Sequence, residues 1–257
     1  MNLHVKPKVP ALNILVLASG KLNSKEAENE FPLCLTEMRE VSVLEHIVNN
    51  TARIPNTQYA FTFLETEAVR YHLEKIATLL VPDARSTQVP ELSQGSACTA
   101  LMAACQLDQA SELLIISANE LVDIELAEVI EEFRYRKLDA GTLTFRSIHP
   151  RYSYVRLNDE GMVIEAAQRE PISFFATVGV FWFAKTDCFV ESAKNLIRKD
   201  AHVDGSFFVA PTFNELVLKH KKIGIKELET AKYFPLKTDH QVEQVEQVDQ
   251  LERGKRA

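Results

Sequence analysis

The chain has 257 residues, of which 46% are hydrophobic, and its formal net charge is −7. This length suffices for one large α/β domain, and the acidic balance argues against general nucleic-acid binding. No apolar run reaches about 18 residues and the first residues lack a hydrophobic signal core, so we expect a cytoplasmic protein without a membrane span. The four cysteines lack C-x-x-C spacing, which favours buried free thiols in a reducing compartment over a zinc site.

The sequence pattern divides the chain into three parts. Residues 1–11 form an arm with two prolines, residues 12–240 carry the alternating pattern of one domain, and residues 241–257 form a charged tail. Valine recurs at every third position from 242 to 248, which suits a terminal helix that docks on the body or on a partner. A frayed, charged end is the alternative.

The stretch 12–20, L-N-I-L-V-L-A-S-G, predicts a central, buried parallel strand that ends in a tight turn. Such a strand delivers its turn to the carboxyl edge of an α/β sheet, where these folds bind ligands. Ala18, Ser19 and Gly20 are therefore candidate nucleotide-binding residues, because a glycine lets a phosphate approach the main chain. A plain strand-to-loop turn needs the same residues. The polar stretch 21–30 is either a loop that closes over a ligand or a solvated loop.

The remaining elements follow from hydrophobic periodicity. Helical spacing predicts helices over 41–50, 67–80, 125–136, 187–199 and 208–219, and small residues open another at 94–104. The helix 67–80 would place Val69, Leu73, Ile76 and Leu80 on one core-facing side. Strands are predicted over 59–64, 86–89, 112–117, 141–145, 177–184 and 222–226, and the turn N-D-E-G at 158–161 marks a hairpin. The alternation predicts an α/β fold with an antiparallel hairpin in its second half.

Two polar stretches sit where ligands are expected. Gln94, Gly95 and Ser96 open a helix with small side chains, which can leave backbone N–H groups exposed to an anion or a nucleobase. Close packing of the helix on the sheet requires the same residue types. The second stretch, 118–123, follows the buried strand 112–117 and contains Asn119, Glu120 and Asp123.

Eight segments in order give the chain a resemblance to the nucleotidyltransferase superfamily, which includes sugar-phosphate nucleotidyltransferases and GT-A glycosyltransferases. They are L-V-L-A-S-G, F-P-L-C-L-T-E, Q-G-S-A-C-T-A-L, L-L-I-I-S-A-N-E-L-V-D, H-P-R-Y-S-Y-V-R-L, E-A-A-Q-R-E-P-I-S, A-T-V-G-V-F-W-F and V-A-P-T-F-N-E-L-V. The resemblance spans residues 13–239 and is nearest to a bacterial polysaccharide-locus branch, sometimes labelled family 2 glycosyltransferase. It implies a Rossmann-like, mostly parallel mixed sheet flanked by helices.

The resemblance also shows where catalytic residues are missing. The family wraps the triphosphate with a G-x-G-x-R loop, whereas here Gly20 is followed by Lys21-Leu22-Asn23, so Lys21 is the one candidate cation. The family also has a proline–lysine pair whose lysine contacts the phosphates; here the pair is Pro32-Leu33, so this cation is missing. The Mg²⁺-binding aspartate falls on Asn119, and a neutral amide is a poor ligand for a hard cation.

Other acidic and basic residues are candidates to complete the site. Glu120 and Asp123 are the carboxylates nearest to Asn119 that could hold Mg²⁺, although Asp123 as the N-cap of the following helix is favoured. Arg169 stands where the family has a lysine that contacts the sugar phosphate, and it keeps the charge with a different geometry. The resemblance implies substrate contacts for Arg151, Glu165 and Asn214, with a structural ion pair as the ordinary alternative for Arg151. Ser206 stands where related enzymes often have an acid.

Three functions remain open on this basis. The leading hypothesis is a nucleotidyltransferase-like protein of nucleotide-sugar or surface-polysaccharide metabolism that joins a nucleoside triphosphate to a sugar phosphate, or to a similar phosphorylated small molecule, and releases pyrophosphate. A GT-A glycosyltransferase would consume a nucleotide sugar instead. The third is a catalytically degenerate binding or regulatory subunit in a homo- or hetero-oligomer. The family's arginine, lysine and metal-binding aspartate are all missing here, and losing one such contact commonly costs about 2.7–4 kcal/mol of transition-state stabilisation.

Overall fold

A computed structural model of the chain describes residues 9–20, 31–38 and 40–236. Lys21 and the tail 241–257 therefore lie outside the described residues. The helices are α1 (Val43–Thr51), α2 (Glu65–Tyr71), α3 (Leu73–Leu80), α4 (Ser96–Ala104), α5 (Leu126–Tyr135), α6 (Thr186–Arg198) and α7 (Thr212–Val217), with 3₁₀ turns η1 (Leu33–Leu35) and η2 (Thr230–Lys232). The strands are β1 (Leu12–Leu17), β2 (Glu37–Met38), β3 (Val41–Ser42), β4 (Thr57–Leu64), β5 (Arg85–Val89), β6 (Glu112–Ser117), β7 (Glu120–Val122), β8 (Ala140–Arg146), β9 (Ser153–Leu157), β10 (Val163–Gln168), β11 (Phe175–Phe183), β12 (Ile223–Glu227) and β13 (Tyr233–Pro235).

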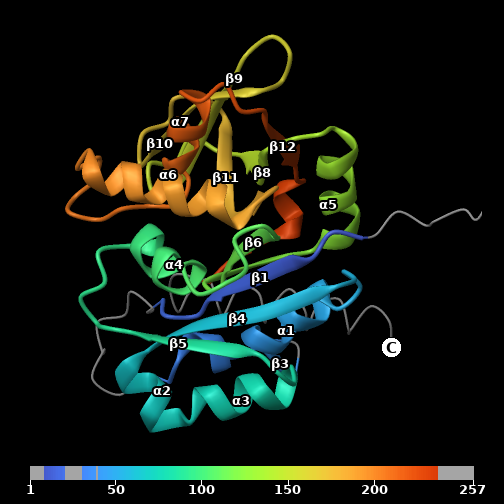
Figure 1. Cartoon of the computed structure of the whole chain (residues 1–257), viewed down its shortest axis with the longest axis vertical. Helices are drawn as coiled ribbons and strands as arrows, with labels where there is room; N and C mark the ends of the chain where they lie inside the picture. The colour runs from blue at the N-terminus through green and yellow to red at the C-terminus, as the bar shows by residue number, and fades with distance from the viewer. Residues whose placement is uncertain (1–8, 21–30, 39, 237–257) are drawn as a thin grey trace, which may run out of the picture.

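A nine-stranded mixed sheet runs through the molecule in the order β10-β9-β11-β6-β1-β4-β5, and β8 branches from β11 and pairs on its other side with β12 (Figure 1). The predicted central strand is β1, which pairs in parallel with both β4 and β6 and has all six residues buried. β4 pairs in parallel with β5, whereas β11 lies antiparallel to β6 and β8. The predicted Rossmann-like α/β fold is confirmed.

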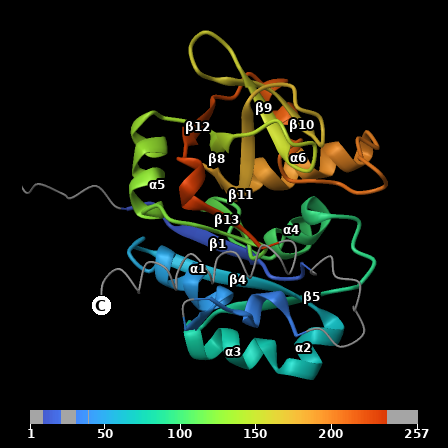
Figure 2. The ribbon, with the colours of Figure 1, turned by 180° about the vertical axis from the view of Figure 1, so that it is seen from behind.

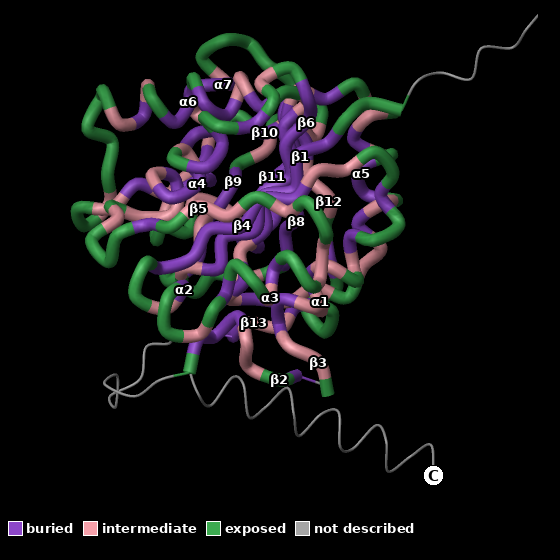
Figure 3. The backbone as a smooth tube through the Cα atoms, turned by 60° about the horizontal axis from the view of Figure 1, so that its bottom comes forward, coloured by how far each residue is buried: buried purple, intermediate pink, exposed green. Residues whose placement is uncertain are grey.

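Helices cover the two faces of this sheet (Figures 1 and 2). Side chains of a strand alternate between faces, so Ile14 and Val16 pack with buried residues of α1, α3 and α5. Leu15 and Leu17 pack on the opposite side with buried residues of α4, α6 and α7. The buried residues gather in the central strands, while most loops are exposed (Figure 3). The pairing register of β1 is therefore fixed, because a shift by one residue would move the side chains of each face to the opposite face of the sheet.

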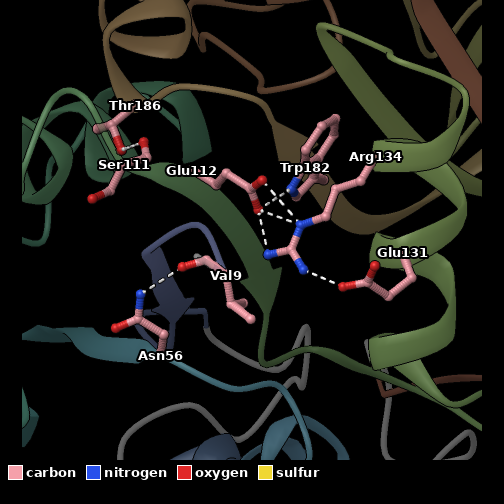
Figure 4. Close-up of polar contacts among 8 residues, drawn as sticks. All are labelled: Val9, Asn56, Ser111, Glu112, Glu131, Arg134, Trp182 and Thr186. Atoms are coloured by element: carbon pink, nitrogen blue, oxygen red, sulfur yellow. Dashed lines mark hydrogen bonds and ion pairs between the residues drawn. The ribbon is translucent and has the colours of Figure 1, made fainter. Parts of the chain in front are cut away.

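A buried ion pair joins α5 to the start of β6 (Figure 4). The Arg134 guanidinium donates Nε and Nη2 to the Glu112 carboxylate at 2.8–3.1 Å, and the Trp182 indole N–H donates to the same carboxylate at 3.2 Å. Arg134 and Glu112 side chains are only 13% and 7% exposed. This cluster lies at the amino end of β6, so it fixes the helix on the sheet at the edge opposite to Ser117.

The predicted helix over 67–80 is wrong in one respect, because the structure breaks it into α2 and α3. His72 separates them with a φ of +55°, a left-handed conformation that ends the first helix. Leu73 is completely buried, but Val69 is 66% exposed. Periodicity could not detect the break, since the apolar spacing continues across it.

Three smaller expectations also need correction. The helix predicted over 208–219 is limited to α7, which begins directly after Pro211. Asp123 is not the N-cap of α5, because the cap position is Glu125 and its side chain makes no capping bond. The cysteines are all free, as expected, but only Cys34 is buried, while Cys98 and Cys188 are partly buried and Cys105 is exposed. The hairpin is confirmed as β9–β10, with Gly161 at a φ of +74° in its turn.

Candidate functional site

A cavity of about 350 Å³ opens at the carboxyl ends of β1 and β6, on the sheet face that carries α4. Its floor includes Leu17 and Ser117, the last residues of these two strands. Among the described residues that line it, the charged ones are Glu120, Arg151 and Arg169. Two cations beside one carboxylate suit an anionic ligand, although the whole chain is acidic.

The predicted turn after β1 lies beside Asn119. Ala18 is buried, Ser19 is half-buried and Gly20 is exposed. A Cβ built on Gly20 would lie 3.7 Å from the Asn119 Cβ, so the ends of β1 and β6 bring these two residues together as expected for parallel neighbours. Asn119 lines the cavity, and its Oδ1 accepts a bond of 2.7 Å from the Ser117 hydroxyl.

The start of α4 combines a structural glycine with a residue of the cavity. Gly95 has a φ of +95°, and a Cβ there would lie 2.4 Å from the Phe207 carbonyl oxygen. The Phe207 backbone closes this contact, since its N–H donates to Gln94 at 2.8 Å and its carbonyl accepts from Ala97 at 3.0 Å. Close packing therefore explains Gly95 fully. Ser96 lines the cavity and remains a candidate ligand contact.

The structure does not gather the three predicted metal ligands at one point. Glu120 is 6% exposed, and its Oε2 accepts a 2.6 Å bond from the Tyr233 hydroxyl. Its Oε1 lies against Gly179, where a Cβ would approach it to 2.1 Å. Asp123 is exposed and lines a second cavity of about 460 Å³, with Ile116, on the face of α1 and α5.

The residues that the structure describes at this cavity do not fit a magnesium ion. Mg²⁺ requires a near-octahedral set of oxygen ligands, usually including one or two carboxylates. At this cavity the described chain offers the Asn119 amide and the Glu120 carboxylate, and both already take part in hydrogen bonds. No cluster of three or more His, Cys, Asp or Glu side chains suited to a metal occurs within residues 9–20, 31–38 and 40–236.

An aromatic cluster connects Glu120 to Arg151. The rings of Tyr233 and Tyr152 lie 6.1 Å apart and both pack on Phe145. The Arg151 guanidinium sits over the Tyr152 ring at 4.9 Å and donates to its hydroxyl at 2.8 Å. Burial raises the pKa of Tyr233, and the nearby Glu120 carboxylate raises it further, so this hydroxyl stays a donor. Glu120 therefore holds Tyr233, and the cluster orients Arg151 at the cavity.

Arg169 enters the cavity from the end of β10 in a left-handed conformation, with a φ of +61°. Its backbone N–H donates to the Tyr152 carbonyl at 2.9 Å. Its guanidinium lies 5.9 Å from the Phe208 ring centre and forms an ion pair with Asp204. Arg151 precedes β9 and Arg169 follows β10, so the antiparallel pairing of the hairpin brings both residues to its open end, at one cavity.

The last two predicted substrate contacts lie elsewhere. Glu165 forms an ion pair with Arg156 on the β9–β10 hairpin. The Asn214 amide accepts from the Ala166 N–H and donates to the Ala166 carbonyl, each at 2.8 Å, and so fastens α7 to β10. Neither residue is among those that line the cavity, and each has a structural role in the described chain.

Sequence reasoning missed Tyr152, Tyr233, Asp204 and Phe208. Tyr233 belongs to β13, which pairs with β7 in a separate two-stranded sheet. Its contact with Glu120 spans 113 positions, and no local pattern predicts it. Asp204 does carry a signal, because Asp-Gly predicts a tight turn that presents the aspartate at the surface.

No protein-family model and no curated protein matches the sequence. Solved structures do match over almost the whole chain. A nucleoside-diphosphate-sugar pyrophosphorylase from Vibrio cholerae aligns with a TM-score of 0.75 at 16% identity, covering 91% of this chain and 99% of that chain. A protein assigned as a glucose-1-phosphate thymidylyltransferase from Bacillus anthracis, solved with sucrose, gives 0.73 at 15% identity, with coverage of 93% and 95%.

A UDP-glucose pyrophosphorylase complexed with UDP-glucose is also similar. It gives a TM-score of 0.72 at 10% identity, and the alignment covers 94% of this chain and 99% of that chain. Within the described residues, no helix is long and apolar enough to cross a membrane. The order of strands, the position of the cavity and these full-length matches together lead to one conclusion: the chain has the fold of the nucleotidyltransferase superfamily.

Proposed function

We propose that this chain binds a nucleotide sugar or a sugar phosphate at the cavity above the carboxyl edge of the sheet, and that nucleotidyl transfer by it is slow. The observation that carries the proposal is the charge arrangement of the cavity. Arg151 and Arg169 face it, while the carboxylate of Glu120 is committed to Tyr233. The third hypothesis from the sequence, a binding or regulatory subunit, agrees best with this arrangement.

The proposed ligand class rests on the fold and on the two arginines. Guanidinium groups bind phosphates with planar, forked hydrogen bonds. Phe208 offers a ring and Ser96 a hydroxyl at the same cavity, which suits a sugar or a base attached to the phosphate. One similar structure contains UDP-glucose, and this compound is the natural first probe.

The reaction of the nucleotidyltransferases requires charged groups that are missing from this chain at the corresponding positions. An oxygen of the sugar phosphate attacks the α-phosphorus of the triphosphate, and the bond to the leaving pyrophosphate breaks. Catalysis then depends on positioning and on neutralising the phosphates. The family's lysine is Leu33 here, and Asn119 replaces its aspartate. Each lost contact of this kind lowers the rate by about 10²–10³.

Calorimetry with UDP-glucose, dTDP-glucose and glucose 1-phosphate tests the binding. We expect a measurable affinity that falls at least about tenfold in Arg169→Gln and in Arg151→Gln, because each removes a charge-assisted contact. Arg156→Gln is the matched control, since its side chain is 50% exposed, like the 49% of Arg169, and does not line the cavity.

A pyrophosphate-release assay with nucleoside triphosphate and glucose 1-phosphate separates binding from turnover. We expect slow or no release from the isolated chain. Rapid release would restore the leading hypothesis from the sequence, and release of nucleoside diphosphate from a nucleotide sugar would point to glycosyl transfer. No heat with any of the three ligands at millimolar concentration would refute the proposed function.

A further inference from the structure

A tight turn places a carboxylate against one of the two cavity arginines. Val203 and Ser206 exchange backbone hydrogen bonds of 2.9 and 3.0 Å across this turn. Asp204 and Gly205 between them have φ angles of +49° and +73°, and the Gly205 N–H donates to the His202 ring at 3.1 Å. The turn is therefore defined by its own hydrogen bonds, and it directs the Asp204 carboxylate to Arg169.

The two cations of the cavity differ in what they already bind. Arg151 donates to the neutral Tyr152 hydroxyl and forms no ion pair with a carboxylate in the described part of the chain. Arg169 has Asp204, bound through Nη1, and the ring of Phe208. Arg169 and Phe208 line the cavity, whereas Asp204 does not. The Asp204 carboxylate thus binds the Arg169 guanidinium from outside the cavity that a ligand would fill.

We infer that Asp204 is a built-in counter-ion for Arg169, which an incoming phosphate group displaces when it binds. The inference rests on the proposed function and adds a residue that weakens the affinity. Asp204 holds Nη1, so a phosphate can use the edge formed by Nη1 and Nη2 as a bidentate donor, and can receive the full charge of the guanidinium, only when this carboxylate gives way. The pair is well suited to exchange, because the two side chains are 49% and 73% exposed and such surface pairs are weak.

Asp204→Asn tests this exchange without disturbing the turn. Asparagine tolerates the left-handed backbone conformation that Asp204 adopts, so the loop is retained. Since exposed pairs of this kind are weak, we expect UDP-glucose to bind about 1.4- to fivefold more tightly to this variant. The gain should shrink in 0.5 M salt, and it should vanish in an Arg169→Gln background. Asp159→Asn, in the exposed hairpin turn, controls for net charge.

Titration with inorganic pyrophosphate makes the result independent of the sugar and the base. If pyrophosphate binds more tightly to Asp204→Asn while UDP-glucose, dTDP-glucose and glucose 1-phosphate bind to no variant, the counter-ion role holds and the proposed function fails. If the wild-type chain binds UDP-glucose and Asp204→Asn binds it equally or more weakly, the counter-ion role is overturned. If pyrophosphate and the three sugar ligands bind to no variant, both conclusions are refuted.

Discussion

Glu120→Gln is the substitution that most directly tests how the site is held together. The Glu120 carboxylate is 6% exposed and accepts a 2.6 Å bond from the Tyr233 hydroxyl, which is equally buried. Through Tyr233 it fixes β13 on β7, and through the ring contact with Tyr152 it supports the place of Arg151. Glutamine keeps the shape and one acceptor oxygen but removes the charge.

The magnitude follows from the kind of bond that is lost. A hydrogen bond to a charged group contributes about 1.5–3 kcal/mol, and a neutral one about 0.5–1.5 kcal/mol. We therefore expect Glu120→Gln to lower the free energy of unfolding by about 1–2 kcal/mol, a factor of about 5–30 in the folding equilibrium. Tyr233→Phe leaves a buried carboxylate without its donor and should cost about 1–3 kcal/mol.

Urea unfolding of both single variants and the double variant gives the coupling between the two residues. Because they share one hydrogen bond, the double variant should lose less stability than the two single losses added together, by about 1 kcal/mol. Glu125→Gln is the control, since its side chain is 30% exposed and pairs with the exposed Arg53. Strictly additive losses, or a Glu120→Gln variant as stable as the wild type, would refute the role given to this bond.

Three further outcomes are expected. Arg134→Gln should lower the free energy of unfolding, measured with urea, by about 3–5 kcal/mol, because it leaves the buried Glu112 carboxylate without its partner. Arg53→Gln, which breaks an exposed pair, should lower it by at most about 1 kcal/mol, and equal losses in the two variants would contradict the importance of burial. Tyr233 has a folded-state pKa raised above its ordinary 10.0, so its contribution to stability is complete below pH 10 and declines as the pH rises further. Urea midpoints from pH 8 to 11 should fall less steeply in Tyr233→Phe, and identical slopes would disprove this. Removal of divalent cations with EDTA should leave the affinity for UDP-glucose within about twofold, and a loss above tenfold would show a metal in binding.

The local pattern of apolar residues was enough to predict most of the sheet. Six consecutive buried positions make β1 a central strand, and the N-D-E-G turn makes β9–β10 a hairpin, because side-chain periodicity and turn chemistry act over a few residues. The same pattern placed Ser117, Asn119 and Gly20 at the carboxyl edge, since adjacent parallel strands end together. It could not predict the break at His72, where backbone conformation changes without a change in apolar spacing.

The composition of the candidate site depended on contacts between distant segments. The predicted hairpin brings Arg151 and Arg169 together at its open end, but only the pairing of β9 with β11 places that end at the cavity. Asp123 follows Asn119 by four residues and yet faces the other side of the sheet, while Tyr233 reaches Glu120 across 113 positions. The amino-acid pattern alone determined the α/β fold and the edge of the sheet where the candidate cavity lies. Only tertiary packing decided which charges share that edge, because a carboxylate's role is set by the neighbours that desolvate it and bind it.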